Sequence, residues 1–205
     1  MSQLMRSPMS TLIRLTLISC LYIFTLQPVS LRANPLKTHI PKVKPMSKLI
    51  VNFDHIDGWY TINDNVMGGV SRGRMSLKTK GIGLFSGDLS LKYNGGFSST
   101  RLHIPTHALA HDQGLEIRVR GDGRRYELLV APPRSPGSWQ RSFTAPSEWS
   151  IIRIPFSLMI LSIRGWTPPN APMIDQTQIA KLGLIIKDKV AGPFHLEIDW
   201  IRAYE

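Results

Sequence analysis

Residues 194–200 read FHLEIDW, and apolar side chains occupy every second position of this stretch. Side chains two positions apart point to the same face of a β-strand. The stretch therefore predicts a strand with one apolar face for a core and one polar face for solvent. Residues 115–120 (LEIRVR) and 152–154 (IRI) repeat this alternation. These three segments indicate a protein built from half-buried strands.

The chain after residue 48 divides into short strand-like runs separated by glycine-rich turns. Strands are expected at 49–53, 73–79, 82–91, 97–104, 114–120, 125–131, 139–144, 149–155, 182–187 and 194–203. One short helix is expected at 175–182, with Asp175 as its N-cap. About ten antiparallel strands with one polar face each favour two packed sheets, so the expected fold class is all-β.

Residues 15–26 (LTLISCLYIFTL) form an uncharged apolar run that follows Arg6 and Arg14. Its length and the preceding charge are typical of a signal peptide. The run is short for a transmembrane helix, which needs about 20 apolar residues. Three alternatives stay open: a lipoprotein signal ending at Cys20, an organelle transit peptide, and a translation start at Met46.

The chain is therefore expected to consist of three parts. Residues 1–33 are expected to form the signal-like or transit-like leader, residues 34–48 a linker rich in proline and lysine, and residues 49–205 the domain. Membrane association is expected only through the leader. The protein is then exported or membrane-associated if the leader is real, organellar in a eukaryote, and cytoplasmic if translation starts at Met46.

Positive charge is concentrated at the N-terminal end. The chain has 25 basic and 14 acidic side chains, but residues 1–48 contain seven of the basic ones and none of the acidic ones. The remaining 18 basic and 14 acidic side chains give residues 49–205 a net charge of +4. This small excess does not indicate a nucleic-acid partner. The one cysteine, Cys20, lies outside the domain, which excludes an internal disulfide and cysteine catalysis there.

Three segments go beyond a general strand pattern: 59–71 (WYTINDNVMGGVS), 87–101 (GDLSLKYNGGFSSTR) and 117–126 (IRVRGDGRRY). Their order and spacing resemble the complex I intermediate-associated protein 30 family, and so does the end of the domain at 154–156 and 192–201. The resemblance runs from about Leu49 to Tyr204. It implies a galactose-binding-like jelly roll, a two-sheet sandwich. It also implies a role as an assembly factor or chaperone, with protein subunits of a respiratory or other membrane complex as partners.

The glycine-rich motifs allow two readings. Asn63 and Asp64 can accept hydrogen bonds from backbone amides, and paired glycines permit positive φ angles or close approach of another group. These residues therefore either build the turns that close the sandwich or line one exposed rim that binds a partner. The candidate rim consists of Trp59, Asn63, Asp64, Met67, Gly68, Gly69, Ser71, Gly95, Gly96, Phe97, Ser99 and Arg101.

Two further candidate sites follow from residue types. Basic and aromatic side chains around the Gly-Asp-Gly turn give a second candidate surface, formed by Arg120, Asp122, Tyr126 and Trp139. Carboxylates before the first motif and on the last strand give weak calcium candidates, which are Asp54, Asp57 and Glu197. No other metal and no cofactor is expected.

The sequence contains no G-x-S-x-G, Walker or H-E-x-x-H motif, so no catalytic residues are assigned. The function expected is a non-catalytic binding and assembly module that acts through protein–protein contacts. The alternative is a carbohydrate-binding jelly-roll module that would use exposed aromatic rings, with Trp59, Trp139 and Trp166 as candidates. A hydrolase with an unrecognised site is the third hypothesis.

Overall fold

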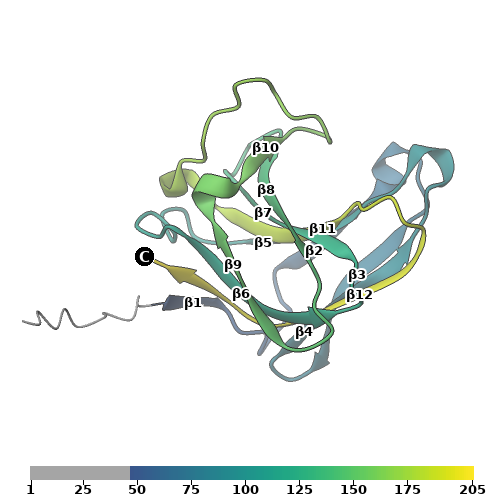
Figure 1. The fold of residues 1–205 in the computed structure, drawn as a ribbon, viewed down its shortest axis with the longest axis horizontal. Helices are drawn as coiled ribbons and strands as arrows, with labels where there is room; N and C mark the ends of the chain where they lie inside the picture. Colours follow the sequence, from purple (N-terminus) through teal and green to yellow (C-terminus); the bar gives the residue numbers. More distant parts are fainter. Residues whose placement is uncertain (1–46) are drawn as a thin grey trace, which may run out of the picture. The chain divides into compact units, whose positions relative to one another are not determined.

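The computed structural model describes residues 47–205, which fold as a β-sandwich of two antiparallel sheets (Figure 1). Sheet A contains β1 (Ser47–Val51), β3 (Arg72–Thr79), β4 (Ile82–Leu89), β6 (Gly114–Gly121), β9 (Ser150–Pro155) and β12 (Gly192–Tyr204). Sheet B contains β2 (Trp59–Asn63), β5 (Ser98–His103), β7 (Arg125–Ala131), β8 (Ser138–Thr144), β10 (Ile160–Ser162) and β11 (Lys181–Ile186). In this range the helical elements are four single 3₁₀ turns: η1 (Asp64–Met67), η2 (Lys92–Asn94), η3 (Phe156–Leu158) and η4 (Gln176–Gln178). The expected all-β jelly-roll class is confirmed.

The long strand β12 organises sheet A, whose strand order is β3-β4-β12-β6-β9. On one edge β12 pairs with β4 through residues 192–198 and then with β1 through residues 201–204. On the other edge it pairs with β6 through residues 196–204. The 13 residues of β12 are enough to pair with two strands in succession on one edge, and its pairing with β6 on the other edge contains a register shift between Ile198 and Trp200.

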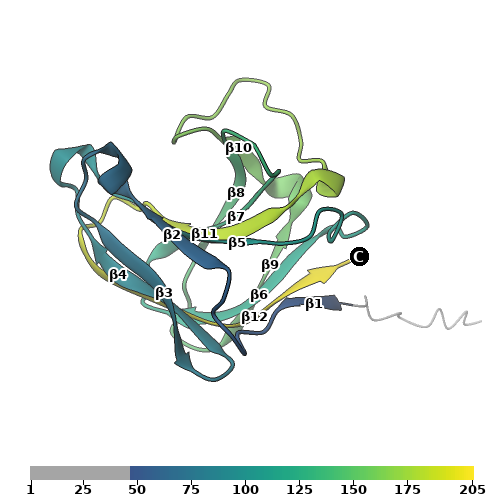
Figure 2. The same cartoon turned by 180° about the vertical axis from the view of Figure 1, so that it is seen from behind.

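Sheet B has the order β10-β8-β7-β11-β5-β2. Alternate side chains of its central strands enter the core, as Leu128 and Val130 do from β7 and Leu182 and Leu184 do from β11. The residues between them point away from sheet A. Figure 2 shows sheet B between η1 and η2 on one side and the segment after β10 on the other.

Aromatic rings join the two sheets in the core. Phe85 and Phe194 of sheet A meet edge to face at 5.1 Å between ring centroids. Tyr126 of sheet B lies 6.4 Å from Phe194 and 6.2 Å from Phe143. Offset and edge-on arrangements of this kind add to the free energy gained from burial.

The ten expected strands are all present, with ends that differ by at most two residues. Strands β2 and β10 were not expected. All five residues of β2 are half-buried, so the strand has no clear alternation of apolar and polar positions. Strand β10 has only three residues, which is too short for a pattern. The first strand begins at Ser47, two residues before its expected start.

The helix expected at 175–182 is wrong. Asp175 does act as an N-cap, since its side chain accepts a hydrogen bond from the Thr177 backbone amide, but the helix ends after the single turn η4. The Ala180 amide then donates to the Ala131 carbonyl oxygen, and the Ala180 carbonyl oxygen accepts from Ile104. These bonds to neighbouring strands hold the chain extended, and β11 begins at Lys181.

The expected leader at 1–33, its Cys20 and the possible start at Met46 lie outside the described residues, as does the linker up to residue 46. Within the part of the chain that the structure describes, no helix has the length and apolar character needed to cross a bilayer.

Gly87 sets the spacing of the β3–β4 pair, and its replacement provides a test of this register. A Cβ at this position would lie 1.9 Å from the Arg72 carbonyl oxygen and 2.6 Å from the Gly73 Cα. Gly87→Ala should therefore lower the free energy of unfolding by at least about 2 kcal/mol, measured by urea denaturation. The neighbouring Ser86→Ala change, on the other side of the strand, should cost less than about 0.5 kcal/mol. Equal stability of the two variants would contradict the register.

Candidate functional site

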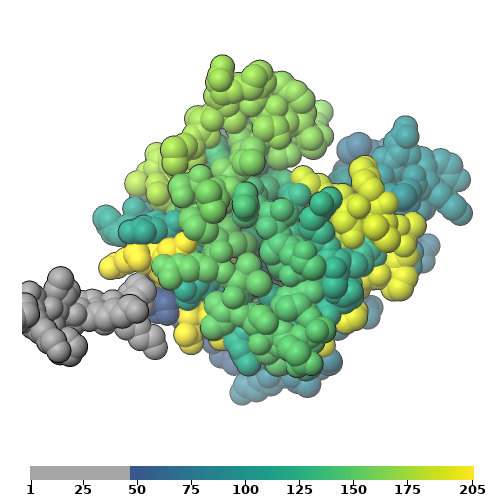
Figure 3. Space-filling model, in the orientation of Figure 1, coloured from purple at the N-terminus to yellow at the C-terminus, as the bar shows by residue number. Residues whose placement is uncertain are grey.

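Two loops that flank the β3–β4 hairpin form a lobe at one end of the sandwich. Residues 64–71, which include η1, and residues 90–97, which include η2, lie side by side in both ribbon views (Figures 1 and 2). The lobe projects from the body of the sandwich in the space-filling view (Figure 3). We call these two segments the loop lobe.

The buried carboxylate of Asp64 holds the loop lobe together. Its side chain is fully buried and accepts hydrogen bonds from the Ser71 amide at 2.9 Å and the Gly96 amide at 2.7 Å. The Ser71 hydroxyl donates a further, short hydrogen bond to the same carboxylate. One charged group thus joins the start of the first loop, its end and the second loop. Hydrogen bonds to a charged group are stronger than those between neutral groups.

The glycines of both loops lie against this carboxylate. A Cβ on Gly69 would lie 2.3 Å from the Asp64 Cγ, and a Cβ on Gly95 would lie 2.4 Å from Asp64 Oδ2. Gly68 has a φ of +90° and ends η1 in the left-handed conformation. The glycine pairs are therefore required for close approach to Asp64 and for the turn.

The pKa of Asp64 reflects two opposing effects. Burial by itself raises the pKa, but hydrogen bonds from the Ser71 side chain and from the backbone amides of Gly96, Ser71 and Phe97 outweigh it. The pKa is therefore held below the ordinary value of 3.8, and the carboxylate is charged at neutral pH.

The other polar residues of the two motifs also serve the fold. Asn63 Oδ1 accepts hydrogen bonds from the Gly73 amide at 3.1 Å and the Ser98 hydroxyl at 2.7 Å. The Ser71 hydroxyl oxygen accepts from the Ser90 amide at 2.9 Å. These contacts fasten β2 to β3 and β5, and the first loop to the second.

The outer surface of the loop lobe carries several large apolar side chains. Five large side chains on it are strongly exposed: Val66 by 68%, Met67 by 63%, Val70 by 46%, Leu91 by 43% and Tyr93 by 72%. We call them the loop-tip patch. Tyr93 is also held in the left-handed conformation, with φ 56° and ψ 39°. That conformation is unfavourable for a residue with a Cβ, and such strain is concentrated at functional sites.

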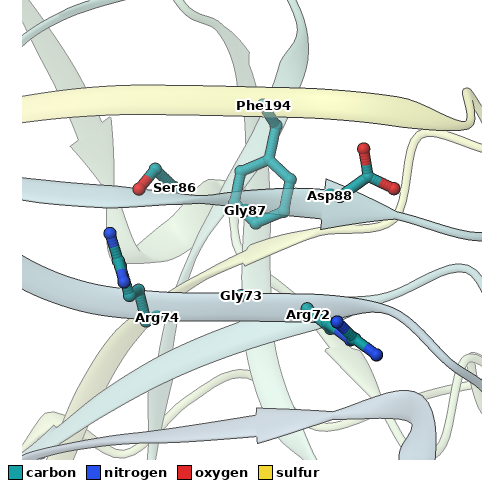
Figure 4. A pocket seen from close by; sticks show the side chains of 7 residues that line it. All are labelled: Arg72, Gly73, Arg74, Ser86, Gly87, Asp88 and Phe194. Atoms are coloured by element: carbon teal, nitrogen blue, oxygen red, sulfur yellow. The ribbon is translucent and has the colours of Figure 1, made fainter.

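A hollow of about 440 Å³ borders the loop lobe on strands β3 and β4 (Figure 4). Gly73 and Gly87 face each other across the strand pair, and Phe194 lies beside them. The exposed side chains of Arg72 and Arg74 stand on its β3 side. Because β3 begins directly after Ser71, these arginines place positive charge next to the loop-tip patch.

The structure separates the residues of the candidate rim. Met67 and Gly68 are exposed in the loop lobe, and Phe97 is half-buried in it. Exposure was wrongly expected for Asp64, Gly69, Ser71, Gly95, Gly96 and Ser99, which are buried. Trp59 stacks on the core residue Phe53 at 5.6 Å and is partly buried there. Arg101 lies away from the loop lobe, on the outward side of sheet B. Sequence reasoning missed the exposed Val66, Val70, Leu91 and Tyr93, although their apolar type in glycine-rich loops was a usable signal.

The second candidate surface does not form. Tyr126 is fully buried, and Trp139 is 9% exposed with its Nε1 donating to the Pro172 carbonyl oxygen. Arg120 is on the outer side of sheet A, where it pairs with Glu197 and stacks on Trp149. Asp122 accepts from the Tyr126 hydroxyl at 2.9 Å, so it supports the core. The exposed aromatic platform expected from Trp59 and Trp139 is likewise wrong, whereas Trp166 is 60% exposed.

The calcium candidates do not gather. The Glu197 carboxylate is held by Lys78 and Arg120, and Asp54 bonds to Asn52. Among residues 47–205 no group of three or more His, Cys, Asp or Glu side chains is placed to hold a metal ion.

Replacement of Asp64 tests the role of its charge. A group whose pKa is lowered by folding adds stability above its ordinary pKa, and this contribution is lost as the pH falls through the folded value. Asp64→Asn should lower the free energy of unfolding by about 3 kcal/mol at pH 7, since it replaces the charged acceptor of these amide and hydroxyl donors with a neutral amide. The deficit should shrink below pH 3.8.

Urea denaturation between pH 7 and pH 2 measures both effects. Asp57→Asn, at an exposed carboxylate, is the matched control and should change stability by less than about 0.5 kcal/mol. A constant deficit of Asp64→Asn at every pH would show that the charge does not hold the loops.

Comparison with known proteins places this fold and its loops in context. The model of the complex I intermediate-associated protein 30 family matches residues 50–198. A mouse mitochondrial complex I intermediate-associated protein 30 is 26% identical over 174 residues, which cover 74% of this chain and 53% of that protein. The probable counterpart of Caenorhabditis elegans is 31% identical over 97 residues, which cover 44% of this chain and 28% of that protein. The chain thus spans about half or less of the length of these relatives.

Among solved structures, the family 11 carbohydrate-binding module of a cellulosomal cellulase of Clostridium thermocellum is similar, with a TM-score of 0.61 and 16% identity. The match covers 78% of this chain and 95% of that module. An agarase matches with a TM-score of 0.54 and 12% identity over 77% of this chain and 26% of the agarase. At these identities the likeness concerns the sandwich fold. The family match covers most of the domain, including the whole loop lobe, and the chain belongs to the complex I intermediate-associated protein 30 family.

Proposed function

We propose that this protein is a non-catalytic assembly module that holds a protein subunit of a respiratory or other membrane complex through the loop-tip patch. The observation that carries this proposal is the exposure of five large apolar side chains on two loops that a buried charge holds in place. Exposed apolar residues scattered singly are ordinary, but a gathered group marks an interaction site.

The rigidity of the loop lobe supports the same function. Binding by a mobile loop costs free energy because the loop must become ordered. Here Asp64, Ser71 and the glycines already fix both loops, so little ordering is left to the partner. The polar groups of the two motifs form hydrogen bonds within the loop lobe and to the adjoining strands.

Positively charged side chains around the loop-tip patch indicate an acidic surface on the partner. Arg72, Lys92 and Lys189 are exposed in or beside the loop lobe, and the Lys189 Nζ lies close to Gly96. Protein interfaces commonly have an apolar centre and a polar rim. The matching subunit would present an apolar depression with acidic side chains around it.

The family adds a biological setting. The mouse relative is named a mitochondrial complex I intermediate-associated protein, and the part shared with this chain includes the loop lobe. Subunits awaiting assembly expose surfaces that later become interfaces, and an apolar patch can cover such a surface.

Site-specific crosslinking tests this function. A photoreactive phenylalanine analogue at Met67 should crosslink to subunits of a membrane complex when the full chain is mixed with solubilised membranes of its source organism. The same analogue at Met173, which is 73% exposed in another segment, is the matched control. Mass spectrometry should recover complex subunits at least tenfold more from Met67 than from Met173. Equal recovery, or binding of the chain only to anionic lipid vesicles, would contradict the proposal.

Tyr93 offers a test in which stability and binding change separately. Asparagine accepts the left-handed conformation more readily than tyrosine. Tyr93→Asn should leave the melting temperature unchanged or raise it, while it reduces subunit capture at least fivefold. Arg164→Asn is the matched control, because Arg164 is exposed and also has a positive φ of 51°. That variant should keep full capture. Loss of capture in both variants would mean that Tyr93 has no specific role.

A further inference from the structure

The outward side of sheet B carries a second group of residues that the loop lobe does not use. Leu129 of β7 and Ile185 of β11 point away from the core but are nevertheless 0% and 8% exposed. Gly183 of β11 lies opposite Leu129 of the neighbouring strand β7 and opposite Arg101 of the neighbouring strand β5. We call this side of sheet B the outward face.

Arg101 lies on the outward face at β5, next to Gly183 of β11. Its stem rests on Gly183, where an added Cβ would lie 3.1 Å from the Arg101 Cγ. A side chain at position 183 would therefore displace the arginine. The absence of one at this position leaves room for the Arg101 stem beside Gly183.

The Arg101 guanidinium is incompletely bonded. Its Nε is buried without a hydrogen-bond partner, the one such side-chain atom among the described residues. No carboxylate within residues 47–205 forms an ion pair with Arg101, whereas Lys187 on the same face is paired with Glu127 at 3.1 Å. A guanidinium that is not engaged by a carboxylate of its own chain can receive a carboxylate at its remaining N–H groups without losing an existing ion pair.

Lys181 adds a second positive charge at a defined spacing. It pairs with His103 in the β5–β11 register, so Arg101 is its diagonal neighbour on the same face. Diagonal neighbours are about 7–8 Å apart, and alternate side chains of an extended peptide repeat at about 6.6 Å. Two carboxylates at positions i and i+2 of an extended chain can therefore reach Arg101 and Lys181 together.

We propose that the outward face of sheet B binds an extended acidic segment of a protein partner, with one carboxylate on the Arg101 guanidinium and a second on Lys181. Arginine presents a planar fork of donors that matches a carboxylate. This binding deepens the proposed function, on which it rests, because it describes a second contact with a protein partner.

A neutral glycan is a poorer match to this face. Sugar rings stack on exposed aromatic rings, but along the outward-pointing positions of sheet B the aromatic side chain is Tyr60, whose ring already stacks on His103 at 5.4 Å. The groups available on this face, Arg101 and Lys181, are positively charged. They complement the acidic side chains of a peptide.

Fluorescence polarisation with the full chain tests this proposal. The probe is a labelled hexapeptide of alternating glutamate and leucine, and its comparison is the same peptide with glutamine in place of glutamate. We expect the glutamate peptide to bind at least tenfold more tightly. Arg101→Gln should reduce this preference to below twofold, and Arg101→Lys should restore only part of it, because lysine lacks the fork. Lys181→Gln should reduce it about threefold.

Two controls separate specific binding from general attraction to a basic chain. Arg141→Gln removes an exposed positive charge from β8 at a position that faces the other side of the sheet, and it should leave the preference unchanged. Tyr93→Asn should weaken subunit capture but not peptide binding. If the unmodified chain captures subunits but does not bind the glutamate peptide, the inference about the outward face is wrong while the proposed function stands.

Three further outcomes would overturn the proposal. Equal affinity for the glutamate and glutamine peptides, or an equal effect of Arg141→Gln and Arg101→Gln, would overturn the proposal. Oligogalacturonate that binds the Arg101 site more tightly than the peptide would overturn it in favour of an acidic glycan.

Discussion

The burial of Asp64 is the constraint on which the loop lobe depends. Other buried carboxylates of the sandwich have a cation: Asp112 has Lys48, Asp188 has Arg124 and Glu197 has Lys78 and Arg120. Asp64 is instead held by backbone amides and a hydroxyl that come from the loops themselves. Its charge is therefore stabilised only while both loops keep one conformation, which makes the two loops a single cooperative unit. The display of apolar side chains on the loop tips follows from this rigidity.

The motifs that mark the family consequently report how the loops are held rather than what they bind. Gly69 and Gly95 are needed because the Asp64 carboxylate occupies the space of their missing side chains. The Gly-Asp-Gly-Arg segment is similar: Arg124 holds Asp188 through two hydrogen bonds and so ties the β6–β7 turn to the loop before β12. Burial acts against the charged forms, but these bonds lower the pKa of Asp188, so the pair is charged at neutral pH. The residues proposed to contact a partner are the exposed ones between these fixed points.

Much of the fold followed from the alternation of residue types, and little of the site did. The pattern of 194–200 predicted a strand because each apolar residue enters the core, as Phe194, Leu196 and Ile198 do. It could not reveal β2, whose residues are half-buried on both sides. Nor could it show that Tyr126 and Trp139 share the core while Arg101 remains outside, since that depends on which face each strand turns inward. The spacing between Arg101 and Gly183 exists only through strand pairing across more than 80 positions of sequence.

The arrangement of β12 has a consequence for how the chain folds as it is made. Residues 192–204 leave the ribosome after every other strand of the sandwich, yet they supply the partner for one edge of β4, one edge of β6 and the whole of β1. Until then sheet A consists of separate pieces with unpaired edges, and strands with open apolar edges tend to associate with other chains. Such non-local pairing also folds slowly. A protein proposed to assist the assembly of others would thus itself pass through a vulnerable interval at the end of its own synthesis.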